Sequence, residues 1–152
     1  MRHGATDTTT GDPPGFLLGD CATQRNLSEA GRDQSRRVGA RIRAERVPIA
    51  QVFTSPWCRC RETAMLAFGK ADDWEALSST FALPESEADF SERVRKRVGG
   101  YSTRRLQGNV VMVTHNVNIA ALTKLSVAPA EIVVVRPDGC CGLRVVTRIA
   151  DQ

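Results

Sequence analysis

Aromatic residues, lysine and histidine are all scarce in this sequence. Its 152 residues include five Phe, two Trp, one Tyr and two His. Arginine supplies eighteen of the 21 basic side chains, and the formal net charge is +4. The arginines are scattered, whereas nucleic-acid surfaces usually combine a basic patch with aromatic residues, so we expect no nucleic acid as a partner. A guanidinium binds two oxygens of one phosphate, so the arginine excess favours a small phosphorylated ligand.

Long apolar segments are also absent from the sequence. No run is long enough to span a bilayer, and the N-terminus has no signal-peptide core. The chain as given is therefore expected to stay in the cytoplasm, with no membrane partner. Its composition, 41% hydrophobic and 25% charged, suits one globular domain over residues 1–152.

The five cysteines do not form a recognisable metal or redox motif. Their number is odd, no C-x-x-C pair occurs, and only two histidines are present to join them. We therefore expect neither a bound metal nor another cofactor, and we favour buried or partly buried thiols. One bridge, for example between Cys21 and Cys60, remains an alternative for an exported protein.

Turn and capping residues mark where the first elements begin. The segment from Thr8 to Gln24 is rich in Thr, Gly, Asp and Pro and is expected to form a long loop. Ser28 is a suitable N-cap for the helix that follows. The apolar side of this helix would carry Ala30, Val38 and Ile42.

Three more helices are predicted further along the chain. One covers 58–69 and ends at a glycine, and one covers 86–98, acidic at its start and basic at its end. A last helix covers 116–125. The poorly patterned segment 73–85 is expected to be a loop that contains a short strand.

Four strands are predicted, two between these helices and two after the last of them. The segments 50–55 and 109–114 are apolar, and the second is apolar on both faces, which is typical of a central strand. The segments 131–137 and 143–149 flank a Pro-Asp-Gly turn and indicate a pair of joined strands. The alternation predicts an α/β fold in which helices cover a mostly parallel sheet.

Polar residues follow the carboxyl ends of the predicted strands, where such sheets bind ligands. Arg59 follows the first of these strands, His115 ends the next, and Asn116 opens a helix. If Arg2 and His3 end another strand, two guanidinium groups and two imidazoles would surround one pocket. A neutral histidine can attack phosphorus while the other groups hold the phosphoryl oxygens. Each residue alone could be a solvated or capping residue, and it is their combination that favours a reactive centre.

Four segments, in this order, resemble the histidine phosphatase superfamily, which is also called phosphoglycerate mutase-like. They are Arg2-His3-Gly4, then "RNLSEAGRDQSRRVG", "SPWCRCRETA" and "VVMVTHNVNI". The tryptophan–cysteine form of the third segment is similar to that of a small bacterial subgroup. The resemblance implies a three-layer α/β sandwich with a mostly parallel central sheet between helices.

The resemblance also implies catalytic roles. His3 would be the nucleophile, held by a backbone carbonyl through one ring nitrogen, and would form a phosphohistidine that water then hydrolyses. Arg2, Arg59 and His115 would neutralise the transferring group.

The resemblance implies two further kinds of site residue. Gly4 and Asn116 would contribute to substrate binding. The family's acid, which protonates the leaving oxygen, usually lies between the third and fourth of these segments. Glu85 is our candidate, and Glu87 and Glu75 compete with it.

One feature of the family has no counterpart here. Its central strand directly precedes the Arg-His-Gly motif, whereas this sequence has only Met1 there. Two interpretations follow: the natural product starts upstream, or this is a damaged and weakly active relative. We favour the first because the rest of the pattern is coherent. An upstream portion could also carry an export signal, and the protein would then be periplasmic.

We therefore expect a metal-independent phosphatase acting on a small phosphate monoester. A mutase is a weaker alternative, because the family's mutases carry long insertions that this chain lacks. A non-catalytic protein that binds phosphate esters is an alternative of a different class. Specificity would come from the Thr8–Cys21 loop and from residues 74–87. The sequence does not indicate an oligomeric state.

Overall fold

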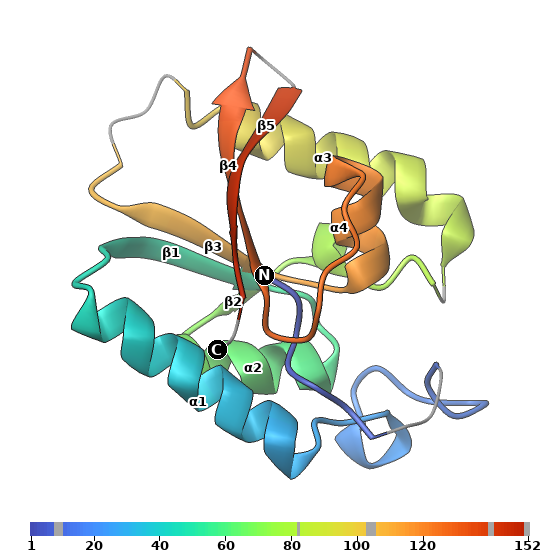
Figure 1. The fold of residues 1–152 in the computed structure, drawn as a ribbon. Coiled ribbons are helices and arrows are strands. Elements are labelled where there is room, and N and C mark those ends of the chain that lie inside the picture. The colour runs from blue at the N-terminus through green and yellow to red at the C-terminus, as the bar shows by residue number, and fades with distance from the viewer. Residues whose placement is uncertain (8–10, 82, 103–105, 140–141, 151–152) are drawn as a thin grey trace.

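The protein is described by a computed structural model that covers residues 1–7, 11–81, 83–102, 106–139 and 142–150. Helices α1 and α2 lie on one side of the central strands, and α3 and α4 lie on the other (Figure 1). The elements are η1 Cys21–Thr23, α1 Glu29–Ala44, β1 Ile49–Thr54, α2 Cys58–Phe68, β2 Asp72–Asp73, η2 Glu75–Leu77, η3 Pro84–Ser86, α3 Glu87–Gly99, β3 Asn109–Val113, α4 Asn116–Thr123, β4 Ile132–Asp138 and β5 Gly142–Ile149. The α/β architecture predicted from the sequence is confirmed.

The central sheet is parallel, with the strand order β2-β1-β3. The carboxyl ends of β1 and β3 are in register, because Thr54 pairs with Val113. Residues that follow these two strands therefore meet at one edge of the sheet. Among the described strands of this sheet, β1 is the central one and β3 lies at the edge. The prediction that 109–114 is a central strand is therefore wrong for β3.

The hairpin of β4 and β5 forms a separate antiparallel sheet. Between β3 and β4 lies a mostly apolar cavity of about 510 Å³, lined among others by Val111 of β3 and Val133 of β4. The N-terminal residues enter this gap at one end (Figure 1). There Thr114 donates its N–H to the Met1 carbonyl at 2.9 Å, and Arg2 donates to the Glu131 carbonyl at 3.0 Å. At this end, therefore, a single extended segment, that of Met1 and Arg2, bridges the space between the residues that follow β3 and those that precede β4.

Helix α1 packs against its neighbours through small residues. Gly31 and Gly39 are buried, and a Cβ added to them would lie 1.9 Å from the Ala5 carbonyl oxygen and 2.2 Å from the Ala67 carbonyl oxygen. Ala30 is exposed, so its predicted place on the apolar side is wrong. At these two positions the helix lies too close to its neighbours for a side chain, and a hydrophobicity pattern does not register such a contact.

Several local predictions are confirmed. Ser28 caps α1 by accepting the N–H of Gly31, and Gly69 ends α2 in the left-handed region at φ 72°. Helix α3 is acidic in its first turn and basic in its last. The segment 73–85 contains no strand beyond Asp73 in its described part, which holds the short helices η2 and η3.

The favoured interpretation of the cysteines as thiols is wrong for Cys21 and Cys58, and their pairing also differs from the Cys21–Cys60 alternative. Cys21 is bonded to Cys58, with 5.7 Å between their Cα atoms, and Cys60 is a buried free thiol. Residues two apart on a helix point in opposite directions, so Cys58 faces the loop while Cys60 faces the core. Cys140 and Cys141 lie outside the described residues. No described helix is both long and apolar enough to cross a membrane.

Candidate active site

His3 extends the parallel sheet at its carboxyl edge. Its N–H donates to the Thr114 carbonyl at 3.1 Å, and its own carbonyl accepts the N–H of Ala130 at 3.0 Å. The imidazole Nδ1 lies 2.8 Å from the Gly4 carbonyl oxygen. Because a carbonyl can only accept, Nδ1 carries the proton of this hydrogen bond and Nε2 keeps a free lone pair. The His3 side chain is buried, and its ring is held in one orientation.

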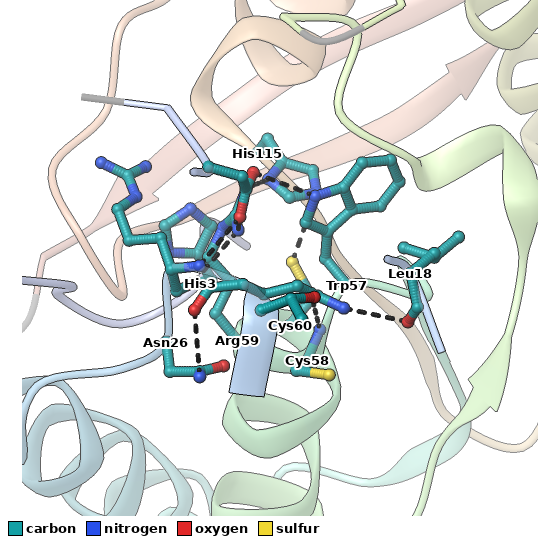
Figure 2. A network of polar contacts seen from close by, with 12 residues as sticks. His3, Leu18, Asn26, Trp57, Cys58, Arg59, Cys60 and His115 are labelled. Carbon is teal, nitrogen blue, oxygen red and sulfur yellow. Dashed lines mark hydrogen bonds and ion pairs between the residues drawn. The ribbon is translucent and has the colours of Figure 1, made fainter. Parts of the chain in front are cut away.

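His115 precedes α4 at the end of β3, and its ring lies 5.4 Å from that of His3 (Figure 2). Its Nε2 lies 2.9 Å from Ser55 Oγ and 3.6 Å from Cys60 Sγ. Its Nδ1 faces the guanidinium of Arg59 at 3.5 Å. A guanidinium only donates, so this arrangement favours the proton on Nε2, where Ser55 accepts it.

Arg59 lies in the first turn of α2 with its side chain 3% exposed. It forms a two-point ion pair with Asp12, with NH1 2.7 Å from Oδ1 and NH2 3.1 Å from Oδ2. Arg59 NH1 also donates to the Arg25 carbonyl at 3.2 Å. The first turn of α2 thus directs a fixed cation at the two histidines.

The site is electropositive and buried. Burial is the main cause that lowers the pKa of His3 to about 3; the Gly4 hydrogen bond opposes this, and the neighbouring arginines reinforce it. Burial, followed by the charges of His3 and the arginines, also lowers the pKa of His115. Both imidazoles are therefore neutral near pH 7. The Nε atoms of Arg2 and Arg59 are buried and have no described partner, so the site has donors to offer an oxyanion.

The other predicted site residues are placed as follows. Arg2 donates from NH1 to the Val127 carbonyl at 2.6 Å, and its charge acts on His3. Gly4 donates its N–H to Thr63 Oγ1. Asn116 accepts the N–H of Val127 and also contacts Ser126, so its amide is directed at the loop that precedes β4.

The three glutamates proposed as the acid are not brought into contact with the histidines by any described hydrogen bond or ion pair. Glu85 lies in η3 and is exposed. Glu87 begins α3, and Glu75 pairs with Arg93. The carboxylate that reaches Arg59 belongs instead to Asp12.

Sequence reasoning missed three residues of the site: Asp12, Ser55 and Trp57. Trp57 lies against His115, with 5.5 Å between ring centroids, and donates from Nε1 to Asp12 at 3.2 Å. The sequence signal for Ser55 and Trp57 was their place directly after a strand. Asp12 lies in a loop that carries no hydrophobic periodicity. Its contact with Arg59 joins residues 47 positions apart in the chain, so no local pattern indicates it.

Comparison with known families decides the classification. A model of the histidine phosphatase superfamily (branch 1) matches residues 1–78, which include His3 and Arg59. This chain belongs to that superfamily. The fold predicted from the resemblance, phosphoglycerate mutase-like, is thereby confirmed as well. Curated protein sequences give no significant match to it.

Solved structures share the histidine phosphatase fold. The protein histidine phosphatase SixA complexed with tungstate has a TM-score of 0.65 at 17% identity, covering 99% of this chain and 94% of its own. Phosphoglycerate mutase from Thermus thermophilus has a TM-score of 0.66 at 22% identity, covering 98% and 95%. Phosphoserine phosphatase from Entamoeba histolytica, in complex with 3-phosphoglyceric acid, has a TM-score of 0.67 at 14% identity, covering 99% of this chain and 95% of its own. Membership of the superfamily supports a phosphatase or mutase enzyme.

No group of three or more His, Cys, Asp or Glu side chains in the described part of the chain could hold a metal ion. Cys60 is not a reactive thiolate, because burial raises the pKa of its thiol to about 12.

Proposed function

We propose that this histidine phosphatase superfamily member hydrolyses a small phosphate monoester, without a metal, through a phosphohistidine on His3. The observation that carries the proposal is the hydrogen bond between His3 Nδ1 and the Gly4 carbonyl. It leaves the lone pair of Nε2 free on a neutral ring, which is the state in which imidazole is a nucleophile. Arg2 and Arg59 supply the charge that the phosphoryl oxygens require.

The reaction then has two steps. Nε2 of His3 bonds to phosphorus as the ester P–O bond breaks, and an acid protonates the leaving oxygen. Water then bonds to phosphorus as the P–N bond breaks, and it gives a proton to the conjugate base of that acid as inorganic phosphate leaves. Glu85, an exposed residue of η3, remains our candidate for the acid.

The first test is hydrolysis of 4-nitrophenyl phosphate in the presence of a chelator. We expect turnover that His3→Ala abolishes and that Arg59→Ala lowers by about two orders of magnitude or more. Arg61→Ala is the matched control, since Arg61 lies on the same helix but is half-exposed and pairs with Asp73. Acid-labile phosphate trapped on the protein, lost in His3→Ala, would identify the intermediate.

Two results would contradict the proposal. Turnover that survives in His3→Ala excludes His3 as the nucleophile. A folded protein that binds inorganic phosphate but shows no turnover would be a non-catalytic binding relative. Release of inorganic phosphate, rather than an isomerised product, separates a phosphatase from a mutase.

A further inference from the structure

The loop from Gly11 to Asn26 is fastened to the first turn of α2. The Cys21–Cys58 disulfide joins the two segments directly. Next to it, the buried amide of Gln24 accepts the N–H of Cys58 at 3.0 Å and donates to two carbonyls of its own loop, one of them that of Leu18 (Figure 2). The ring of Phe16 lies 5.9 Å from that of Trp57.

This fastening brings Asp12 to the active-site arginine. Its Oδ1 accepts from Arg59 NH1 and from the backbone N–H of Arg25 at 3.0 Å. Its Oδ2 accepts from Arg59 NH2 and from Trp57 Nε1. The Asp12 side chain is only 6% exposed, and four donors hold it. A carboxylate bound in this way has a fixed position, and it fixes the group that it binds.

The ion pair with Asp12 occupies only one edge of the Arg59 guanidinium. Asp12 binds the end of the guanidinium, at NH1 and NH2. The edge formed by NH2 and Nε faces the histidines: NH2 lies 3.5 Å from His115 Nδ1, and Nε is buried without a described partner. A phosphoryl group that takes the place of the His115 contact can therefore bind this edge while Asp12 keeps its place.

We propose that Asp12 is the positioning residue for Arg59 in the phosphatase reaction, and that the Cys21–Cys58 disulfide holds it there. This inference rests on the proposed function. Full activity would then require the oxidised bridge, although neither cysteine touches the reacting atoms. Cys21 is exposed, so a soluble thiol can reach the bridge.

The first experiment compares Asp12→Asn with the wild-type chain on 4-nitrophenyl phosphate. We expect kcat to fall about 100-fold, as when a catalytic group is misplaced by about 1 Å. The inhibition constant for inorganic phosphate should tighten, because the site loses a negative charge. Loss of folded protein alone would lower kcat without tightening that constant, and circular dichroism measures the folded fraction. Asp72→Asn, in an exposed residue of β2, is the control.

The second experiment tests the bridge without touching Asp12. Dithiothreitol supplies two electrons and two protons, converts the disulfide into two thiols and is itself oxidised to a cyclic disulfide. We expect wild-type kcat to fall at least tenfold in reductant. The double variant Cys21→Ser/Cys58→Ser should show the lower kcat with or without reductant. It is therefore the control for other effects of dithiothreitol.

The outcomes separate this inference from the proposed function. No turnover by the wild-type chain overturns the function itself. If the wild-type chain is active and kcat of Asp12→Asn lies within threefold of the wild-type value, the inference is overturned. A faster variant also overturns it, since it would mean that Asp12 blocks the site. A fall in kcat that matches the loss of folded protein, with an unchanged phosphate constant, also overturns it. Activity that does not respond to reduction overturns the role of the bridge.

Discussion

The imidazole rings of His3 and His115 lie edge to face at an interplanar angle of 67° and are both buried. Two neighbouring imidazoles in a site rich in arginine cannot both be charged at low cost. Their lowered pKa values therefore make the stability of the fold depend on pH.

Stability should fall as the pH falls below about 6.5. The folded chain holds His3 at a pKa of about 3, whereas the unfolded chain keeps the ordinary value near 6.5, so the unfolded state binds more protons in between. Each pH unit in this range then costs about 1.4 kcal/mol for this residue. Urea unfolding at pH 7 and at pH 5 measures the effect, and His3→Gln should show the smaller slope. Equal slopes in the two chains would refute the assignment.

Gly31→Ala should destabilise the fold by at least about 3 kcal/mol, because the added methyl would overlap the Ala5 carbonyl oxygen. The strand segment that carries His3 and Gly4 would have to move, so activity should fall further than the folded fraction does. Gly19→Ala is the control: nothing lies within 4 Å of its Cβ, and a change within about 0.5 kcal/mol is expected. Thermal unfolding of both variants measures the change in stability. A Gly31→Ala variant as stable as the wild-type chain would show that α1 and Ala5 are not so closely packed.

Ser55→Ala should lower kcat about tenfold and cost about 1–3 kcal/mol of stability, since His115 Nε2 loses its buried partner. The backbone N–H of Trp57 loses the same hydroxyl. Ser102→Ala, in an exposed residue beyond the end of α3, serves as the control. Kinetics of both variants on an aryl phosphate measure the effect, and unchanged kcat in Ser55→Ala would mean that His115 needs no such support.

The effect of Glu85→Gln on the rate of hydrolysis should depend on the leaving group of the substrate. An alkyl phosphate needs its oxygen protonated, so its hydrolysis should slow about 100-fold or more. 4-Nitrophenyl phosphate has a good leaving group and should be affected much less. Glu75→Gln, on an exposed glutamate paired with Arg93, is the comparison variant. Equal effects of Glu85→Gln on the two substrates would exclude Glu85 as the acid.

Acetylation of the Met1 nitrogen should stabilise the chain that begins at this residue. Burial lowers the pKa of this ammonium to about 6 from 8.0, so protonation favours the unfolded state and stability is lost as the pH falls from 8 to 6. The acetylated chain should be more stable by about 2–3 kcal/mol at pH 5.5 and nearly equal at pH 9. The N–H that donates to the Met112 carbonyl is retained. Denaturant unfolding at both pH values tests this, and a difference independent of pH would contradict it.

The elements of this fold could be predicted from local signals, since caps, turns and apolar runs act over a few residues. Ser28, Gly69 and the charge order of α3 are such cases. The place of Ala30 could not, because the buried face of α1 that carries Val38 is completed by Gly31 and Gly39 and not by Ala30. A glycine that allows two backbones to meet has no hydrophobic signal.

The site was predictable where it follows strand ends and unpredictable where it depends on the loop. His3, Arg59 and His115 come together because parallel strands end at the same edge. Asp12 and the Cys21–Cys58 bridge come from a segment without periodicity, whose path is set by tertiary contacts. Two cysteines of α2 were possible partners for Cys21, and only the direction of each side chain on that helix distinguishes them.

The apolar gap between β3 and β4 also affects how the molecule behaves in concentrated solution. β3 ends one sheet and β4 belongs to another, and such strand edges are a template on which another extended segment can pair. A neighbouring molecule that supplied a strand would close the gap and join the two copies. Protein concentration and storage time therefore belong among the controlled variables of every assay described above, and size-exclusion profiles before and after each assay would record the joining.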